Sequence, residues 1–188
     1  NLASTYIFIG DLDAALKNLT NALDYAKKLK NERSEYLIYI ENAKVEFLRD
    51  NQPTSIKLLN KAVEFFNRIK DPTNYFESLK LLAECYIIDD NYAELNVMLN
   101  NIKSTDTHLN DFVELQREYI SIFKSKKIES NVDFIDNNEY DESNAYYLFT
   151  VGKILNNKSF LDKAYEYFTS LYSKTDIYKY KYYMNKMK

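Results

Sequence analysis

The sequence predicts an all-α protein, built as an α-solenoid in which helical hairpins stack one on the next. The first observation is composition, because the 188 residues include only two glycines and two prolines, the residue types that most often interrupt helices. The second is an internal repeat of about 40 residues, which is typical of proteins whose units bury their apolar faces on their neighbours. The third is the spacing of three and four between apolar residues within each unit.

The repeat is clearest where a small residue or a helix end is needed. Ala3, Ala43 and Ala83 are 40 residues apart, and a small side chain there lets a second helix cross closely. Gly10 can adopt the left-handed conformation that ends a helix, and Asp11 can cap the helix that follows. The same interval relates further sets of residues: Gly10, Asp50 and Asp90; Leu19, Leu59 and Leu99; and Ala22 with Ala62.

Regular hairpins follow from this register. In the first, Ala15, Leu19 and Ala22 should lie on the face of the second helix that packs against the first helix. Pro53 suits the first turn of a helix, and Asp71-Pro72 is an N-cap followed by a first helical residue. The expected hairpins span about 1–30, 34–70, 72–104, 109–137 and 143–173, and a capping helix spans 176–188.

The register fails after Ser104 and returns near the C-terminus. The fourth hairpin is degenerate, because its second helix, near 127–137, is rich in Asn and Asp. Residues 129–142 carry six acids and no base, which favours a solvated loop over a site that repels anions. Gly152 then occupies the position of Ala3. The last segment has apolar residues at helical spacing, as a terminal cap does: Ile177, Tyr180, Met184 and Met187.

Charge and hydropathy argue against several classes of function. The net charge of −3 gives no electrostatic reason to expect nucleic-acid binding, and no apolar run is long enough to span a membrane. A single cysteine excludes an internal disulfide and suits a reducing compartment, so we expect a cytoplasmic location. The chain begins at Asn1 within the first helix of a repeat, so we expect it to be a fragment of a longer protein.

Residues for catalysis or metal binding are not expected. His108, the only histidine, lies in a polar stretch without a nearby cysteine, which favours a surface position over a metal ligand. Cys85 follows Glu84 and has no local basic partner, which favours a packed residue over a nucleophile. We therefore expect no enzymatic activity, no cofactor and no metal.

The Tyr- and Lys-rich segment 178–183 allows two interpretations. Alternating aromatic and basic side chains can bind single-stranded nucleic acid by stacking and charge neutralisation. At helical spacing, however, the tyrosines face several directions. A capping helix whose lysines extend into solvent is the interpretation that we favour.

The hairpins resemble tetratricopeptide repeats (TPRs), on the small and apolar positions Ala3, Gly10, Ala15, Leu19 and Ala22 and their equivalents. The resemblance implies that the first helix of each pair lines a concave surface, which binds an extended or helical peptide. The register then identifies the candidate peptide-binding residues: Asn42, Lys44, Phe47, Lys80, Glu84, Ile87, Tyr146, Phe149 and Lys153.

These candidates imply a ligand of a particular kind. Lys44 and Lys80 would present positive charge to it. Phe47, Ile87 and Tyr146 would supply apolar pockets. The expected ligand is a short peptide with an acidic group and one or two bulky apolar residues. The alternative is that neighbouring helices bury these apolar side chains.

The C-terminal hairpin supports a narrower resemblance. The 40-residue period, an Asn-, Lys-, Tyr- and Ile-rich composition, the run Ala145-Tyr146-Tyr147-Leu148 before Gly152, and a lone closing helix resemble the intracellular peptide-pheromone receptors of Gram-positive bacteria and their phages. In that family a helix-turn-helix DNA-binding domain or a short helical bundle precedes the array. A re-imported oligopeptide binds the concave face, and Asn42 is the best equivalent of the asparagines that grip it.

This resemblance implies the ligand-sensing part of a peptide-responsive transcriptional regulator that acts in quorum sensing. A second class of function stays open, namely a constitutive protein–protein interaction scaffold without a small ligand. The expected partner is an oligopeptide or a segment of a partner protein. DNA would be bound only through an upstream domain, no membrane association is expected, and a homodimer is left open.

Overall fold

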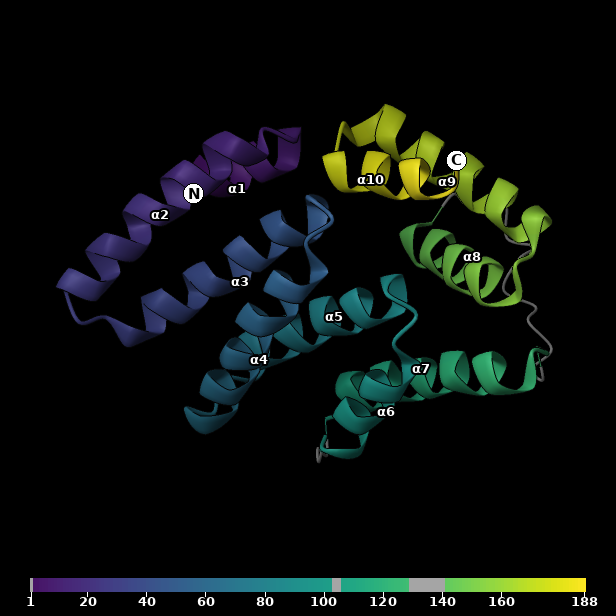
Figure 1. The fold of residues 1–188 in the computed structure, drawn as a ribbon, viewed down its shortest axis with the longest axis horizontal. Helices are drawn as coiled ribbons and strands as arrows, with labels where there is room; N and C mark the ends of the chain where they lie inside the picture. Colours follow the sequence, from purple (N-terminus) through teal and green to yellow (C-terminus); the bar gives the residue numbers. More distant parts are fainter. Residues whose placement is uncertain (1, 103–105, 129–140) are drawn as a thin grey trace. The chain divides into compact units, whose positions relative to one another are not determined.

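The structure is a computed structural model that describes residues 2–102, 106–128 and 141–188 (Figure 1). Within these ranges 84% of the residues are helical and none is in a strand, which confirms the all-α prediction. The helices are α1 (Leu2–Ile9), α2 (Leu12–Lys28), α3 (Glu32–Leu48), α4 (Gln52–Arg68), α5 (Pro72–Ile88), α6 (Tyr92–Asn100), α7 (Thr107–Ser125), α8 (Glu142–Leu155), α9 (Lys158–Thr175) and α10 (Tyr178–Lys186). None of these ten helices combines the length and the apolar character that crossing a bilayer requires. The helix expected near 127–137 and most of the acidic segment 129–142 fall outside the described residues.

The chain forms two compact units, Asn1–Asp90 and Asn91–Lys188. The first contains α1 to α5 and the second contains α6 to α10, so the boundary falls between the two helices of the third expected hairpin. Consecutive helices pack against one another within each unit, which is compatible with a helical solenoid. In the first unit α3 also contacts α1 and α5, so the first helices of successive hairpins are neighbours.

The helix ends follow a regular pattern from α2 to α6. These helices begin at residues 12, 32, 52, 72 and 92, an interval of 20 residues each time. Two residues before each start, the backbone has a positive φ, at Gly10, Lys30, Asp50, Lys70 and Asp90. The residue between is the N-cap, and four of the five N-cap side chains accept a hydrogen bond from the main-chain N–H three residues on: Asp11, Asn31, Asp71 and Asn91. The breaks predicted at Gly10, Asp50 and Asp90 are therefore confirmed.

Small residues lie where the helices cross closely. Ala3, Ala43 and Ala83 are all buried, as their positions predicted. In the second unit, a Cβ atom added to Gly152 would lie 3.0 Å from Leu161 Cγ and 3.1 Å from the Leu161 main-chain nitrogen. Those distances are shorter than ordinary van der Waals contacts, so α8 and α9 approach each other at a position that leaves room only for glycine without adjustment.

One predicted core position is wrong, because Ala22 is exposed whereas Ala15 and Leu19 are buried. The reason is the length of the neighbouring helix. At 1.5 Å per residue, the eight residues of α1 extend about 12 Å, and the 17 residues of α2 extend about 25 Å. The α1 helix runs beside only the part of α2 that is nearest to their connection, so the remainder of α2 has no first helix against it (Figure 1).

The second unit ends in a helix that packs on its predecessor, since α10 contacts α9. Its tyrosines at 180, 182 and 183 are buried, whereas Met184 and Met187 are half-buried. The capping interpretation is therefore supported, although the packed face is formed by tyrosines rather than by the expected methionines. Buried rings at these positions do not form an open platform on which bases could stack.

Candidate functional site

The nine predicted binding residues fall into two groups. Six lie in the first unit, on α3 and α5, and three lie on α8 in the second unit. The groups are Asn42, Lys44, Phe47, Lys80, Glu84 and Ile87, and then Tyr146, Phe149 and Lys153.

On α3, Lys44 belongs to a polar chain that links two first helices. Its Nζ atom lies 2.7 Å from Glu41 Oε1, and the hydroxyl of Ser4 on α1 donates to Glu41 Oε2 at 3.2 Å. The side chain of Lys44 retains 39% exposure and that of Glu41 retains 19%. Ser4, Glu41 and Lys44 therefore form an accessible polar cluster, in which the lysine charge is balanced by a carboxylate.

On α5, Lys80 has a similar local environment. Its Nζ atom lies 2.6 Å from Glu77 Oε1 and 5.0 Å from the centroid of the Phe76 ring. Glu84, four residues further along the same helix, is half-buried. The expected excess of positive charge is thus compensated locally, because Glu41 pairs with Lys44 and Glu77 pairs with Lys80.

Two rows of residues cross the first helices of the first unit at the 40-residue interval. A polar row contains Ser4, Lys44 and Glu84, and an apolar row contains Phe8, Leu48 and Ile88. The members of each row lie on α1, α3 and α5, which are neighbours in the order α1, α3, α5. In the apolar row Phe8 is 44% exposed, Ile88 is half-buried and Leu48 is buried. We call the surface formed by the five members that retain exposure, Ser4, Phe8, Lys44, Glu84 and Ile88, the first-helix face.

Three of the predicted residues lie in the interior of the protein. Phe47 is 1% exposed, Ile87 is 7% exposed and Phe149 is 3% exposed, so their side chains stabilise helix packing instead of lining a surface. This is the alternative in which neighbouring helices bury the apolar members. Asn42 is half-buried on α3. The sequence pattern identified these residues as apolar or polar, but it did not distinguish a residue facing the core from one facing a groove.

In the second unit, α10 packs against two of the three predicted residues of α8, Tyr146 and Phe149. The Tyr146 and Phe149 rings each lie 4.9 Å from the Tyr183 ring in edge-to-face arrangements. Lys179 places its Nζ atom 5.1 Å from the centroid of the Tyr146 ring, and Lys153 on α8 is half-buried. The surface that a ligand was expected to contact on α8 is therefore occupied in part by the chain's own last helix.

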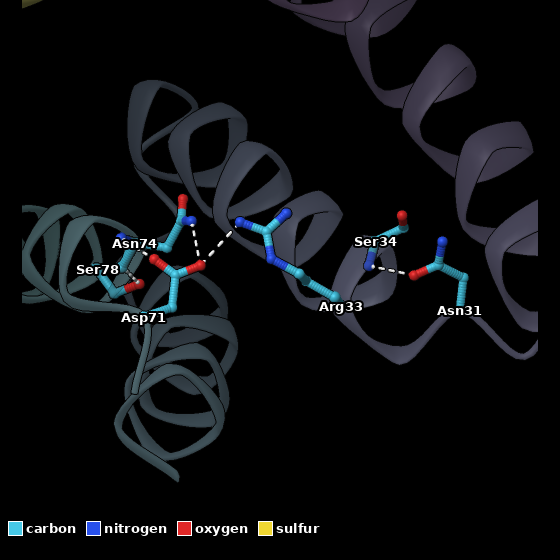
Figure 2. A network of polar contacts seen from close by, with 6 residues as sticks. All are labelled: Asn31, Arg33, Ser34, Asp71, Asn74 and Ser78. Atoms are coloured by element: carbon cyan, nitrogen blue, oxygen red, sulfur yellow. Dashed lines mark hydrogen bonds and ion pairs between the residues drawn. The ribbon is translucent and has the colours of Figure 1, made fainter. Parts of the chain in front are cut away.

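A polar network that the sequence did not predict joins the starts of α3 and α5 (Figure 2). Arg33 Nη2 lies 2.8 Å from Asp71 Oδ2, and Asp71 also accepts hydrogen bonds from the main-chain and side-chain N–H groups of Asn74. The hydroxyl of Ser78 donates to the Asn74 carbonyl at 2.7 Å. The bonds from Asn74, and then the nearby Arg33, lower the pKa of the Asp71 carboxyl below its usual value. Asp71 was identifiable as an N-cap, but its partner lies 38 residues away and required the fold.

Two further ion pairs join different helices of the first unit. Arg49 Nη1 lies 2.7 Å from Asp13 Oδ1, and Arg68 Nη2 lies 3.0 Å from Glu32 Oε1. These contacts are exposed and contribute between about 0 and 1 kcal/mol each. Arg49 and Asp13 connect the end of α3 to α2, and Arg68 and Glu32 connect α4 to α3.

The residues considered for catalysis or metal binding are not members of the first-helix face. His108 is exposed at the start of α7, and Cys85 is fully buried on α5, with its Sγ atom 3.4 Å from Ser55 Oγ. In the part of the chain that the structure describes, no group of three or more His, Cys, Asp or Glu side chains is arranged to hold a metal ion. Comparison of the chain with protein-family models, with curated proteins and with solved structures finds no match.

Proposed function

We propose that the first unit binds a segment of peptide or partner protein across its first-helix face. The observation that carries the proposal is the linked arrangement of Ser4, Glu41 and Lys44 beside the exposed Phe8. It places hydrogen-bonding groups and an accessible apolar ring on the neighbouring helices α1 and α3. Recognition surfaces usually combine a few polar groups in fixed positions with neighbouring apolar surface.

The proposal includes the assignment of the hairpins as TPR-like repeats with a period of 40 residues. Its support is the 20-residue interval between helix starts from α2 to α6 and the burial of Ala3, Ala43 and Ala83 at equivalent positions. In such arrays the first helices form the inner, ligand-binding side. On this assignment Ser4, Lys44 and Glu84 are equivalent positions that contact successive parts of an extended ligand.

The charge balance of the face refines the expected ligand. Glu41, Glu77 and Glu84 outnumber Lys44 and Lys80, so a purely acidic peptide would meet more repulsion than attraction. A ligand with donors and acceptors in alternation, as in an extended peptide backbone, suits this surface better. One bulky apolar side chain would pack on Phe8.

More specifically, we propose that the first unit senses a ligand in a peptide-responsive regulator. The bound peptide shifts the population of conformations of the array. The alternative is a constitutive scaffold, whose face holds a partner's segment without such a shift. A change in hydrogen exchange throughout the unit on peptide binding favours the regulator, and protection confined to the contact residues favours the scaffold.

The proposal is tested with synthetic peptides of five to ten residues, each carrying one bulky apolar residue and an acidic, basic or neutral polar group. The tightest peptide is titrated against the parent chain, Lys44→Glu and Phe8→Ala. Each variant should weaken binding by about tenfold or more, equivalent to about 1.4 kcal/mol. Lys57→Glu, at an exposed lysine of α4, is the matched charge control and should bind as the parent does. Equal affinity for the parent and both face variants would exclude this surface.

A further inference from the structure

The charges on and beside the first-helix face are unevenly distributed over its three helices. The α1 helix has no charged residue, and it contributes the exposed ring of Phe8. On α3 the face has one acid and one base, whereas α5 has two acids and one base in its whole length: Glu41 and Lys44, and then Glu77, Lys80 and Glu84. The face is therefore apolar and uncharged at α1 and carries a formal charge of −1 at α5.

Both lysines are in contact with an acid of their own helix. Lys44 Nζ lies 2.7 Å from Glu41 Oε1, and Lys80 Nζ lies 2.6 Å from Glu77 Oε1. A carboxylate of a ligand would have to compete at either lysine with a carboxylate that the helix already holds there. The excess negative charge of the face is then that of Glu84, so the face favours a cationic group over an anionic one.

The surroundings of Glu84 indicate which kind of cation fits. Ile88 follows Glu84 by four residues on α5, so the two side chains are neighbours on one side of the helix, and both are half-buried. Lysine and arginine combine an aliphatic stem with a charged head, and the stem packs on apolar surface while the head meets its partner. A carboxylate beside a branched aliphatic side chain suits both parts of such a residue.

The distance between Phe8 and Glu84 sets the spacing of the ligand groups. Phe8 is on α1 and Glu84 is on α5, and α3 contacts both helices. Packed helices are about 8–10 Å apart, which places the axes of α1 and α5 about 16–20 Å from each other. An extended peptide advances about 3.3–3.6 Å per residue and covers this distance in about five residues. Lys44 of α3 lies between the two ends, where its ammonium group can donate to a main-chain carbonyl oxygen of the ligand.

We propose that the ligand of the first-helix face is a peptide with a bulky apolar residue and, about five residues from it, a lysine or arginine. The apolar side chain packs on Phe8, and the cation pairs with Glu84 while its stem covers Ile88. This inference rests on the binding function proposed above and specifies the class of peptide. It replaces the acidic group expected from the sequence by a basic one, because the lysines of the face are matched by Glu41 and Glu77.

The test uses three synthetic peptides of equal length. The first has a phenylalanine and a lysine about five residues apart, the second has the same residues adjacent, and the third has glutamate in place of the lysine. The parent chain should bind the first peptide at least about tenfold more tightly than either of the others. The difference between the lysine and glutamate peptides should decrease as the salt concentration rises.

Variants of Glu84 test where the cation binds. Glu84→Gln should reduce the preference for the lysine peptide over the glutamate peptide, and Glu84→Lys should reverse it. Glu64→Gln, at an exposed acid of α4, makes the same change of charge and should keep the parent's preference. Circular dichroism shows that each variant is folded. Equal affinity of the parent for the lysine and glutamate peptides, or an unchanged preference in both Glu84 variants, would overturn the inference.

Phe8→Ala distinguishes a failure of this inference from a failure of the binding function. If Phe8→Ala weakens binding while both Glu84 variants keep the parent's preference, the face binds a peptide and the basic group is wrong. If none of the three peptides binds, or if Phe8→Ala and the Glu84 variants all bind as the parent does, both proposals fail.

Discussion

The hydroxyl of Ser55 donates a hydrogen bond to the main-chain carbonyl oxygen of Ala43 at 2.8 Å. Both residues are fully buried; Ser55 lies in the first turn of α4 and Ala43 in the C-terminal half of α3. The Cys85 Sγ atom of α5 lies 3.4 Å from the same hydroxyl oxygen. Three helices therefore meet around one small polar side chain, with no space for a larger residue at 43.

Replacing Ala43 by leucine should separate α3 from α4 and break the bond from Ser55. We expect a loss of about 1–3 kcal/mol in the free energy of unfolding, the usual range for overpacking a core. Urea unfolding followed by circular dichroism measures it. Ala22→Leu is the matched control, since Ala22 is exposed, and it should leave the stability nearly unchanged. If Ala43→Leu unfolds at the parent's midpoint, the close crossing does not exist.

Overpacking can be tested in the second unit at Gly152. Alanine at this position gains about 1 kcal/mol in helix propensity but brings a Cβ atom to 3.0 Å from Leu161, so Gly152→Ala should lie within about 1 kcal/mol of the parent. Leucine gains a similar helix propensity, but its larger side chain must also be accommodated against Leu161, so Gly152→Leu should cost about 1–3 kcal/mol more than the alanine variant. Thermal melts of both variants measure the difference. Equal stability of the alanine and leucine variants would show that α8 and α9 are further apart than described.

Asp71 should make stability depend on pH in a defined direction. Its carboxylate is stabilised in the folded state, so its folded pKa is lowered, and the contribution is complete above the unfolded pKa of about 3.9. It is lost as the pH falls below that value and through the folded pKa. Asp71→Asn keeps an N-cap but removes the charge opposite Arg33, and should cost about 0.5–1 kcal/mol at pH 7.

The difference between the parent and Asp71→Asn should shrink as the pH is lowered below about 4, because the parent's carboxyl then becomes neutral as well. Urea midpoints at pH 7 and pH 2.5 measure it. Arg33→Gln serves as the partner variant, and its effect should be absent in the Asp71→Asn background. A difference that stays constant over this pH range would show that the carboxylate charge has no role.

The last helix should be necessary for the stability of the second unit. Tyr183 is buried, and its ring lies 4.9 Å from the Tyr146 and Phe149 rings and 5.2 Å from the Phe168 ring. Tyr183→Ala should therefore cost about 3–5 kcal/mol. Lys181→Ala, on the exposed side of α10, is the control and should change stability by no more than about 0.5 kcal/mol. A stable Tyr183→Ala variant would contradict a capping role for α10.

Local signals in the sequence were sufficient to predict most helix ends. Gly10 with Asp11, and Asp71 with Pro72, carry the chemistry of a helix break and a helix start within two residues. The left-handed residues Lys30 and Lys70 carry no such signal, because lysine has no preference for that conformation. Their positions follow from the regular interval between helix starts, because the helices on either side must be joined by a turn there.

Positions that depend on a neighbouring helix were harder to predict. Ala22 has the same residue type as Ala62, and only the length of α1 decides that it is exposed. Phe47 and Phe8 are both phenylalanines on first helices, yet one is in the core and the other is on the surface. The charge of Lys44 is balanced by Glu41, one turn away on the same helix, and Glu41 also accepts a hydrogen bond from Ser4 of another helix. The sequence pattern therefore predicts which helices come first in each hairpin, whereas the residues exposed on those helices depend on packing.

NMR mapping of the tightest synthetic peptide on the 188-residue chain shows whether the first-helix face is where the peptide binds. On addition of the peptide, amide signals of Ser4, Phe8, Lys44 and Glu84 should shift together, with one affinity. Signals on the exposed side of α4, such as that of Lys57, should remain in place. Shifts confined to α2 and α4, or to the second unit, with no change on α1, α3 and α5, would contradict the account.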